Sequence, residues 1–149
     1  MKKIIYAAAW LIAAFAAQQS QAQDIPKATT DTEFVATVQA LVDQHFVIWG
    51  DRSSDRIKRF AAVYTPDITV ADYAAIATGY SDVNLVIDRV QGQHQGFKFS
   101  PEPIVWNHGF GRVRWGFGPE GNPSLVRGED IFTVSDGKLS SLHVFIDNK

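Results

Sequence analysis

The chain has 149 residues, with 14 lysines and arginines against 16 aspartates and glutamates, and it contains no cysteine. This balance of charge argues against nucleic acid or an anionic membrane as a partner. The lack of cysteine excludes disulfides, thiolate catalysis and a cysteine-based zinc site, so packing must supply the stability.

The N-terminal segment has the pattern of a signal peptide. Two lysines precede an apolar run over residues 4–17, and small residues flank Gln21 in the pattern that signal peptidase cuts. The run is shorter than the roughly 20 residues that a membrane span requires. We therefore expect residues 1–22 to be removed during export to the periplasm or beyond, and the mature chain to begin at Gln23 without a stable membrane anchor.

Two helices are predicted after a short polar arm at residues 23–29. Thr30 and Glu33 have the spacing of a capping box, which starts a helix, and Gly50 supplies a stop. A second, shorter helix is predicted from residues 53–54 to the approach of Pro66, since the residue before a proline disfavours helix. Between Thr30 and Gly50 one face is apolar, with residues recurring at steps of three and four: Phe34, Val38, Leu41, Val42, Phe46 and Trp49.

The pattern then changes to that of a sheet. Alternation over residues 68–72 predicts a strand, and a third helix is expected from about Asp82 to Gly96. After Gly96 the signals are for strands only, and Asp136-Gly137 predicts a tight hairpin. The expected strands cover 97–99, 104–106, 112–117, 124–134 and 139–147. A chain in which the helices come first and an antiparallel sheet comes last is typical of the α+β class.

This order resembles the nuclear transport factor 2-like (NTF2-like) superfamily, especially its SnoaL-like and ketosteroid-isomerase-like branches. Three stretches are similar to the family, at residues 64–72, 111–115 and 127–139, and the likeness runs from Thr30 to Asp147. It implies a cone-shaped α+β domain over residues 30–149, in which three N-terminal helices pack against a curved, mostly antiparallel sheet and enclose a small-molecule pocket.

The resemblance also implies roles for two acids. In the isomerases the acid at the position of Asp72 is a general base beside a carbonyl, and the acid at the position of Asp130 donates a hydrogen bond to the developing oxyanion. An apolar wall makes such a carboxylate a better proton acceptor. Two structural alternatives stay open. Asp72 would hydrogen-bond nearby backbone at a strand end, and Asp130 would pair with one of three arginines, Arg112, Arg114 or Arg127.

One departure from the family concerns the first helix. The isomerases carry a tyrosine there as the main oxyanion donor, whereas the equivalent residues 43–45 contain none. Loss of such a donor typically costs about 3 to 4 kcal/mol of transition-state stabilisation, which disfavours steroid-type isomerisation. His45 would fill the gap if it pointed inward, although a histidine beside Phe46 also suits a surface or packing position. Arg127 and Glu129 resemble the epoxide-hydrolase network only weakly, because cross-strand ion pairs are common.

Aromatic residues lie on the elements that would line or close the cone, and such walls suit an apolar or ring-containing ligand. The alternative for each of them is a place in the core. The residues assigned to ligand binding are Tyr73, His45, Trp49, Trp106, Trp115 and Arg127. The other histidines, His94, His108 and His143, lack metal-ligand spacing, so neither a metal nor another cofactor is assigned.

Two functions therefore remain open. The first is an exported, cofactor-independent isomerase, cyclase or lyase acting on a small hydrophobic carbonyl compound, with Asp72 as base and Asp130 as acid or orienting group. The second is a non-catalytic module that binds a hydrophobic ligand or dimerises. In either case the resemblance implies a homodimer formed through the outer face of the sheet.

Overall fold

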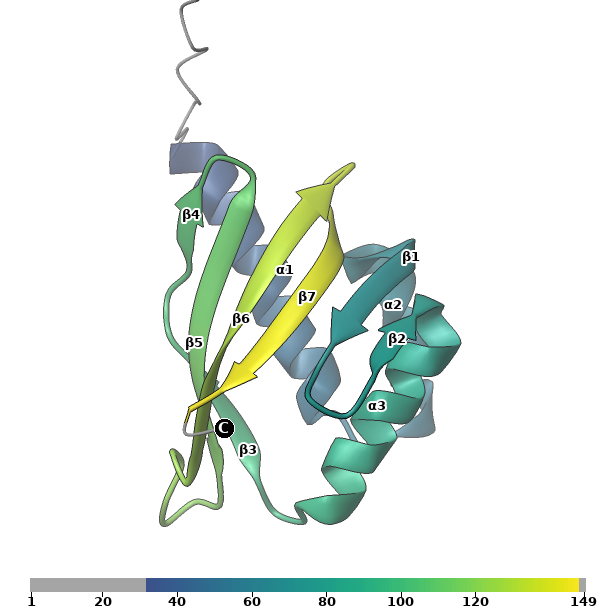
Figure 1. Cartoon of the computed structure of the whole chain (residues 1–149), viewed down its shortest axis with the longest axis vertical. Helices are drawn as coiled ribbons and strands as arrows, with labels where there is room; N and C mark the ends of the chain where they lie inside the picture. The colour runs from purple at the N-terminus through teal and green to yellow at the C-terminus, as the bar shows by residue number, and fades with distance from the viewer. Residues whose placement is uncertain (1–31, 148–149) are drawn as a thin grey trace, which may run out of the picture.

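In the computed structural model, which describes residues 32–147, helices lie on one side of a curved seven-stranded sheet (Figure 1). The strand order is β2-β1-β7-β6-β5-β3, with β4 also pairing with β5. In chain order the elements are α1 Thr32–Gly50, the 3-10 helix η1 Ser54–Arg59, α2 Phe60–Val63, β1 Tyr64–Ala71, β2 Ile76–Thr78, α3 Gly79–Gln93, β3 Lys98–Pro101, β4 Val105–Asn107, β5 Phe110–Gly118, β6 Val126–Ser135 and β7 Lys138–Ile146. The predicted α+β cone with a mostly antiparallel sheet is confirmed.

The register of the central strands decides which side chains face the helices. Val113 of β5, Asp130 of β6 and Val144 of β7 lie directly opposite one another. Paired residues share a face of a sheet, so all three point to the same side. Within the described residues the one parallel pairing joins β1 to β7. The β6–β7 hairpin turns at Asp136 and Gly137, which both have positive φ, as the tight turn predicted from the sequence requires.

The core lies between α1 and the concave face of the sheet. Val38, Val42 and Phe46 of the predicted apolar helix face are buried, whereas Phe34 at the start of α1 is largely exposed. The buried side chains that they meet come mainly from the sheet and include Ile68, Val70, Phe132, Leu139 and Leu142.

Some boundaries differ from the predictions. Tyr64 begins β1 instead of ending the second helix, because Thr65 precedes Pro66 and is restricted to extended backbone. The third helix begins at Gly79, and the short strand β2 before it was not predicted. The predicted signal peptide, arm and capping residue Thr30 lie outside the described residues. None of the helices in residues 32–147 has the length and hydropathy that a membrane span requires.

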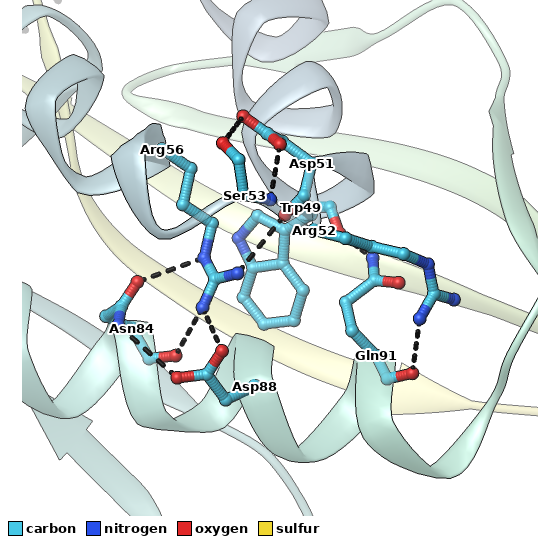
Figure 2. Close-up of polar contacts among 8 residues, drawn as sticks. All are labelled: Trp49, Asp51, Arg52, Ser53, Arg56, Asn84, Asp88 and Gln91. Carbon is cyan, nitrogen blue, oxygen red and sulfur yellow. Dashed lines mark hydrogen bonds and ion pairs between the residues drawn. The ribbon is translucent and has the colours of Figure 1, made fainter.

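A buried arginine joins α3 to the corner that follows α1 (Figure 2). Arg56 is only 2% exposed. Its Nε donates to the Asn84 side-chain oxygen at 3.0 Å, its Nη1 to the Asp51 carbonyl at 3.2 Å and its Nη2 to the Asn84 carbonyl at 3.3 Å, and it also pairs with Asp88. A buried guanidinium needs such partners, and here they come from both elements.

The same corner holds the far end of α3. The Gln91 side-chain amide donates to the Trp49 carbonyl, and Arg52 donates to the Gln91 carbonyl at 2.8 Å (Figure 2). These hydrogen bonds hold the C-terminal part of α3 against the end of α1 and so fix the position of α3 relative to α1.

Candidate functional site

A cavity of about 730 Å³ lies between α1, α3 and the concave face of the sheet. Its volume is in the range of sites for small organic molecules. Most of its wall is apolar, and aromatic rings from α1, β3 and β5 form a large part of it. These rings are Phe46, Trp49, Phe99, Trp115 and Phe117. Phe99 and Phe117 stack with their centroids 4.3 Å apart.

Asp130 is a buried carboxylate in this wall. It lies in the middle of β6, is 4% exposed and lines the cavity. The indole Nε1 of Trp115 donates to its Oδ1 at 2.9 Å, and Nε2 of His45 lies 3.7 Å from its Oδ2. Among residues 32–147, His45 is the one basic side chain within 4.0 Å of this carboxylate. Asp130 is therefore an acidic residue in a largely apolar wall, and no lysine or arginine of the described residues pairs with it.

The arginines considered as partners of Asp130 pair elsewhere. Arg112 and Arg114 lie 3.9 and 3.6 Å from Glu129, and Arg127 lies 3.6 Å from Asp147. Successive side chains of a strand point to opposite faces, so Arg112 and Arg114 lie on the outer face while Asp130 lies on the inner one. The structural alternative of an Asp130–arginine pair is wrong.

His45 connects Asp130 to a buried tyrosine. The imidazole is 2% exposed, lines the cavity, and places Nδ1 2.8 Å from the hydroxyl oxygen of Tyr64. Burial raises the pKa of Tyr64 far above its ordinary range; the Trp49 indole opposes this shift, and the Asp130 charge adds to it. Tyr64 therefore keeps its hydroxyl hydrogen. The inward orientation considered for His45 is the observed one.

Asp72 lines the same cavity as Asp130, but its oxygens are engaged in the turn after β1. Its Oδ1 accepts from the backbone N–H groups of Ala74 at 2.8 Å and Ala75 at 2.9 Å, and its Oδ2 pairs with Arg89 of α3. This is the strand-end arrangement foreseen as the structural alternative. The structure brings the two acids to one cavity, and it leaves Asp130 the less engaged of them.

The remaining predicted binding residues divide into two groups. Tyr73, Trp49, Trp115 and Arg127 line the cavity. Trp106 does not, and its assignment to the pocket is corrected. Its ring packs with that of Phe34 at a centroid distance of 5.3 Å and with that of Phe132 at 6.1 Å, because β4 pairs at the far end of β5.

Several cavity residues were not assigned from the sequence. His94 follows α3 and packs its ring against those of Phe97 and Phe117, with centroids 5.2 and 5.4 Å away. Nothing in the spacing of His94 in the sequence indicated that it lines a cavity. Within the described residues no three histidine, aspartate or glutamate side chains gather to hold a metal ion.

The architecture described above can be compared with that of solved structures. The cone is the NTF2-like fold in the form seen in SnoaL-like proteins, as the sequence predicted. No family model and no curated protein sequence matches the chain.

Solved structures with this fold have little sequence in common with the chain. It is similar to a protein from Agrobacterium tumefaciens described as an isomerase of the SnoaL-like family, with a TM-score of 0.69 and 13% identity over 76% of this chain and 99% of that one. It is also similar to a protein from Sinorhizobium meliloti described as a polyketide cyclase, with a TM-score of 0.60 and 17% identity over 74% of this chain and 97% of the other.

A de novo designed protein with a curved β-sheet also has a TM-score of 0.60, with 12% identity over 76% of this chain and 87% of the design. Since a designed chain shares the fold, the likeness by itself carries no activity. The function has to be argued from the residues of the cavity.

Proposed function

We propose that this protein is a cofactor-independent acid–base enzyme of the isomerase or cyclase type, in which Asp130 transfers the proton. The observation that carries the proposal is a buried carboxylate in a largely apolar cavity, with a tryptophan N–H and a histidine as its polar neighbours. A carboxylate oxygen in the wall of such a cavity can reach a hydrogen of a bound ligand, as a general base must.

In the proposed reaction, Asp130 takes a proton from a carbon beside a carbonyl group. The electrons of the broken C–H bond form a carbon–carbon double bond, and the carbonyl oxygen becomes the enolate oxygen. Asp130, now a carboxylic acid, returns the proton to another carbon of the substrate and completes an isomerisation. Attack of the enolate carbon on a second carbonyl carbon of the substrate would instead close a ring; the electrons of that carbonyl's π bond move to its oxygen, and Asp130 returns the proton to this alkoxide oxygen. The apolar wall favours a small, ring-containing carbonyl compound.

We assign the base to Asp130 in place of Asp72 because the two acids differ in their partners. Both oxygens of Asp72 are occupied, by two backbone N–H groups and by Arg89. Among the described residues, Oδ2 of Asp130 by contrast has no partner within hydrogen-bond distance, so it is open to a ligand in the cavity. On this assignment Asp72 shapes the rim of the cavity and holds the turn after β1.

Exchange of carbon-bound hydrogen in deuterated water tests the proposal. Cyclic ketones such as 2-tetralone and 1-indanone would be incubated with the parent, Asp130→Asn and Asp72→Asn, and loss of the α-hydrogen signal followed by NMR. General-base catalysis contributes roughly 10² to 10⁴ in rate, so Asp130→Asn should lose a factor in that range while Asp72→Asn stays within about tenfold of the parent. Equal exchange by the parent and Asp130→Asn would refute the assignment.

A second function, non-catalytic ligand capture, is favoured by the aromatic wall and by the ion pair that engages Asp72. Thermal shift with the same ketones distinguishes it. A carrier would be stabilised alike in the parent and in Asp130→Asn, and it would return every ketone without deuterium.

We also propose that the protein acts outside the cytoplasm as a homodimer. Within residues 32–147 the helices cover one face of the sheet and leave the other open (Figure 1). Phe145 lies opposite Glu129 in the strand register and is 48% exposed. The mass of the mature chain from its natural host would identify the cleavage site, for which Gln23 is expected as the new N-terminus. Light scattering at micromolar concentration would give the oligomeric state, and a monomeric mass would count against the dimer.

A further inference from the structure

We propose that Tyr64 is a positioning residue that holds His45 in the tautomer with its hydrogen on Nε2, so that this N–H faces Asp130 and the cavity. The tautomer itself follows from the described contacts. Its catalytic consequence rests on the proposed function.

The first step identifies the donor in the contact between the two side chains. The hydroxyl of Tyr64 is completely buried, and its oxygen lies 2.8 Å from Nδ1 of His45. A buried hydroxyl hydrogen needs an acceptor. Among the residues that the structure describes, Nδ1 of His45 is the one hydrogen-bond partner of this hydroxyl. The hydrogen of Tyr64 is therefore given to Nδ1 of His45.

The second step places the hydrogen of the imidazole. A neutral imidazole carries one hydrogen, and the nitrogen that accepts a hydrogen bond cannot carry it. With Nδ1 accepting from Tyr64, the hydrogen is on Nε2, which lies 3.7 Å from Oδ2 of Asp130. That separation exceeds a direct hydrogen bond, so the N–H remains available to a ligand in the cavity that His45 lines.

The two polar neighbours of Asp130 then act on different oxygens. Trp115 already donates to Oδ1, whereas the N–H of His45 faces Oδ2 and the cavity. A ligand oxygen bound beside Oδ2 would accept from His45 while Asp130 takes a proton from the adjacent carbon. The site should therefore prefer ligands that present a hydrogen-bond acceptor, such as a carbonyl oxygen, at this position.

His94 supplies an internal reference of the opposite kind. Its Nδ1 lies 2.9 Å from the carbonyl oxygen of Val90, which can only accept. The hydrogen of neutral His94 is therefore on Nδ1. The two cavity histidines should show opposite tautomers in one sample.

NMR of the ¹⁵N-histidine-labelled protein reads these tautomers directly, at a pH where the imidazoles are neutral. His45 should show a protonated-type shift at Nε2 and an unprotonated-type shift at Nδ1, and His94 should show the reverse. Spectra of His45→Gln and His94→Gln assign the signals. A parent spectrum with the hydrogen of His45 on Nδ1 would overturn the proposal, whatever the variants do.

Two variants test whether Tyr64 sets the tautomer. Tyr64→Phe removes the hydroxyl and should shift His45 toward a mixture of tautomers. Tyr80→Phe is the matched control, since the Tyr80 hydroxyl donates to the Tyr64 carbonyl at 2.9 Å and both rings pack against Phe60. It should leave the His45 signals in place. An unchanged His45 tautomer in Tyr64→Phe would refute the role of the hydroxyl.

Asp130→Asn separates this proposal from the proposed function. If Tyr64 sets the tautomer, the hydrogen stays on Nε2 of His45 in this variant, and loss of the tautomer there would assign the positioning to Asp130 and overturn the proposal. The spectra require no turnover, so they can succeed where ketone exchange fails. The opposite result is also informative. If ketone deuterium exchange depends on Asp130 but the hydrogen of His45 is on Nδ1, the proposed enzyme function is supported and the positioning role of Tyr64 is rejected.

Discussion

Replacing Arg56 by methionine should destabilise the protein by about 3 kcal/mol, because the guanidinium makes three hydrogen bonds to neutral acceptors at about 1 kcal/mol net each. The ion pair with Asp88 adds little, since that carboxylate is 56% exposed. Methionine keeps the apolar stem of the side chain, so the loss isolates the polar head. For a domain of this size, the melting temperature should fall by about 10 °C.

Urea denaturation followed by tryptophan fluorescence measures the change, and Arg59→Met is the matched control. Arg59 pairs with Asp51 at the same corner, but both side chains are partly exposed, so its loss should cost less than about 1 kcal/mol. The reasoning fails if Arg56→Met loses no more stability than Arg59→Met. In that case the network in Figure 2 would not be what holds α3 against the end of α1.

Three further predictions have defined outcomes. Burial raises the pKa of Tyr64 above its value in the unfolded chain, so the folded protein keeps a proton that the unfolded chain loses above about pH 10. The free energy of unfolding should therefore fall above that pH by up to about 1.4 kcal/mol per pH unit, and denaturant titrations should show this part of the slope missing in Tyr64→Phe. Asp72→Asn keeps an acceptor for the turn and should cost less than about 1 kcal/mol, whereas Asp72→Ala should cost about 2; equal losses in urea would contradict the turn assignment. Gly111→Ala would place a methyl group 2.0 Å from the buried ring of Phe132, and it should lower the free energy of unfolding by about 1 to 3 kcal/mol. Gly121→Ala should change the stability very little, because no atom outside its chain neighbours lies within 4 Å of the new methyl group. Calorimetry that finds equal losses for the two variants would refute the steric argument.

Local patterns in the sequence were sufficient for most of the elements. The apolar stripe from Val38 to Trp49 predicted the long helix, and the alternation of apolar and polar residues predicted the strands. Both patterns arise because one side of each element faces the core. Asp136-Gly137 gave its hairpin, since the turn needs two residues that accept positive φ. The strand β2 was missed because three residues carry too little periodicity to recognise.

The candidate site was predictable only in part. Asp130 could be found as an acid inside an apolar strand, and the resemblance supplied a role for it. Its partners could not be found in the same way. Arg112 and Arg114 were plausible in the sequence and lie on the wrong face, while His45 and Tyr64 stand 19 positions apart and meet only because α1 packs across the sheet beside the start of β1.

Short-range periodicity was enough to predict the three helices, every strand except β2, the α+β class and an acid within an apolar strand. The tertiary structure alone decided that Asp72 is engaged by its own turn and Arg89, that Trp106 lies away from the cavity, and that Tyr64, His45 and Asp130 form one connected group. The physical reason is that hydrogen bonds and ion pairs depend on distances of a few ångströms between elements far apart in the chain. Those distances are fixed by strand register and helix packing, which no local pattern encodes.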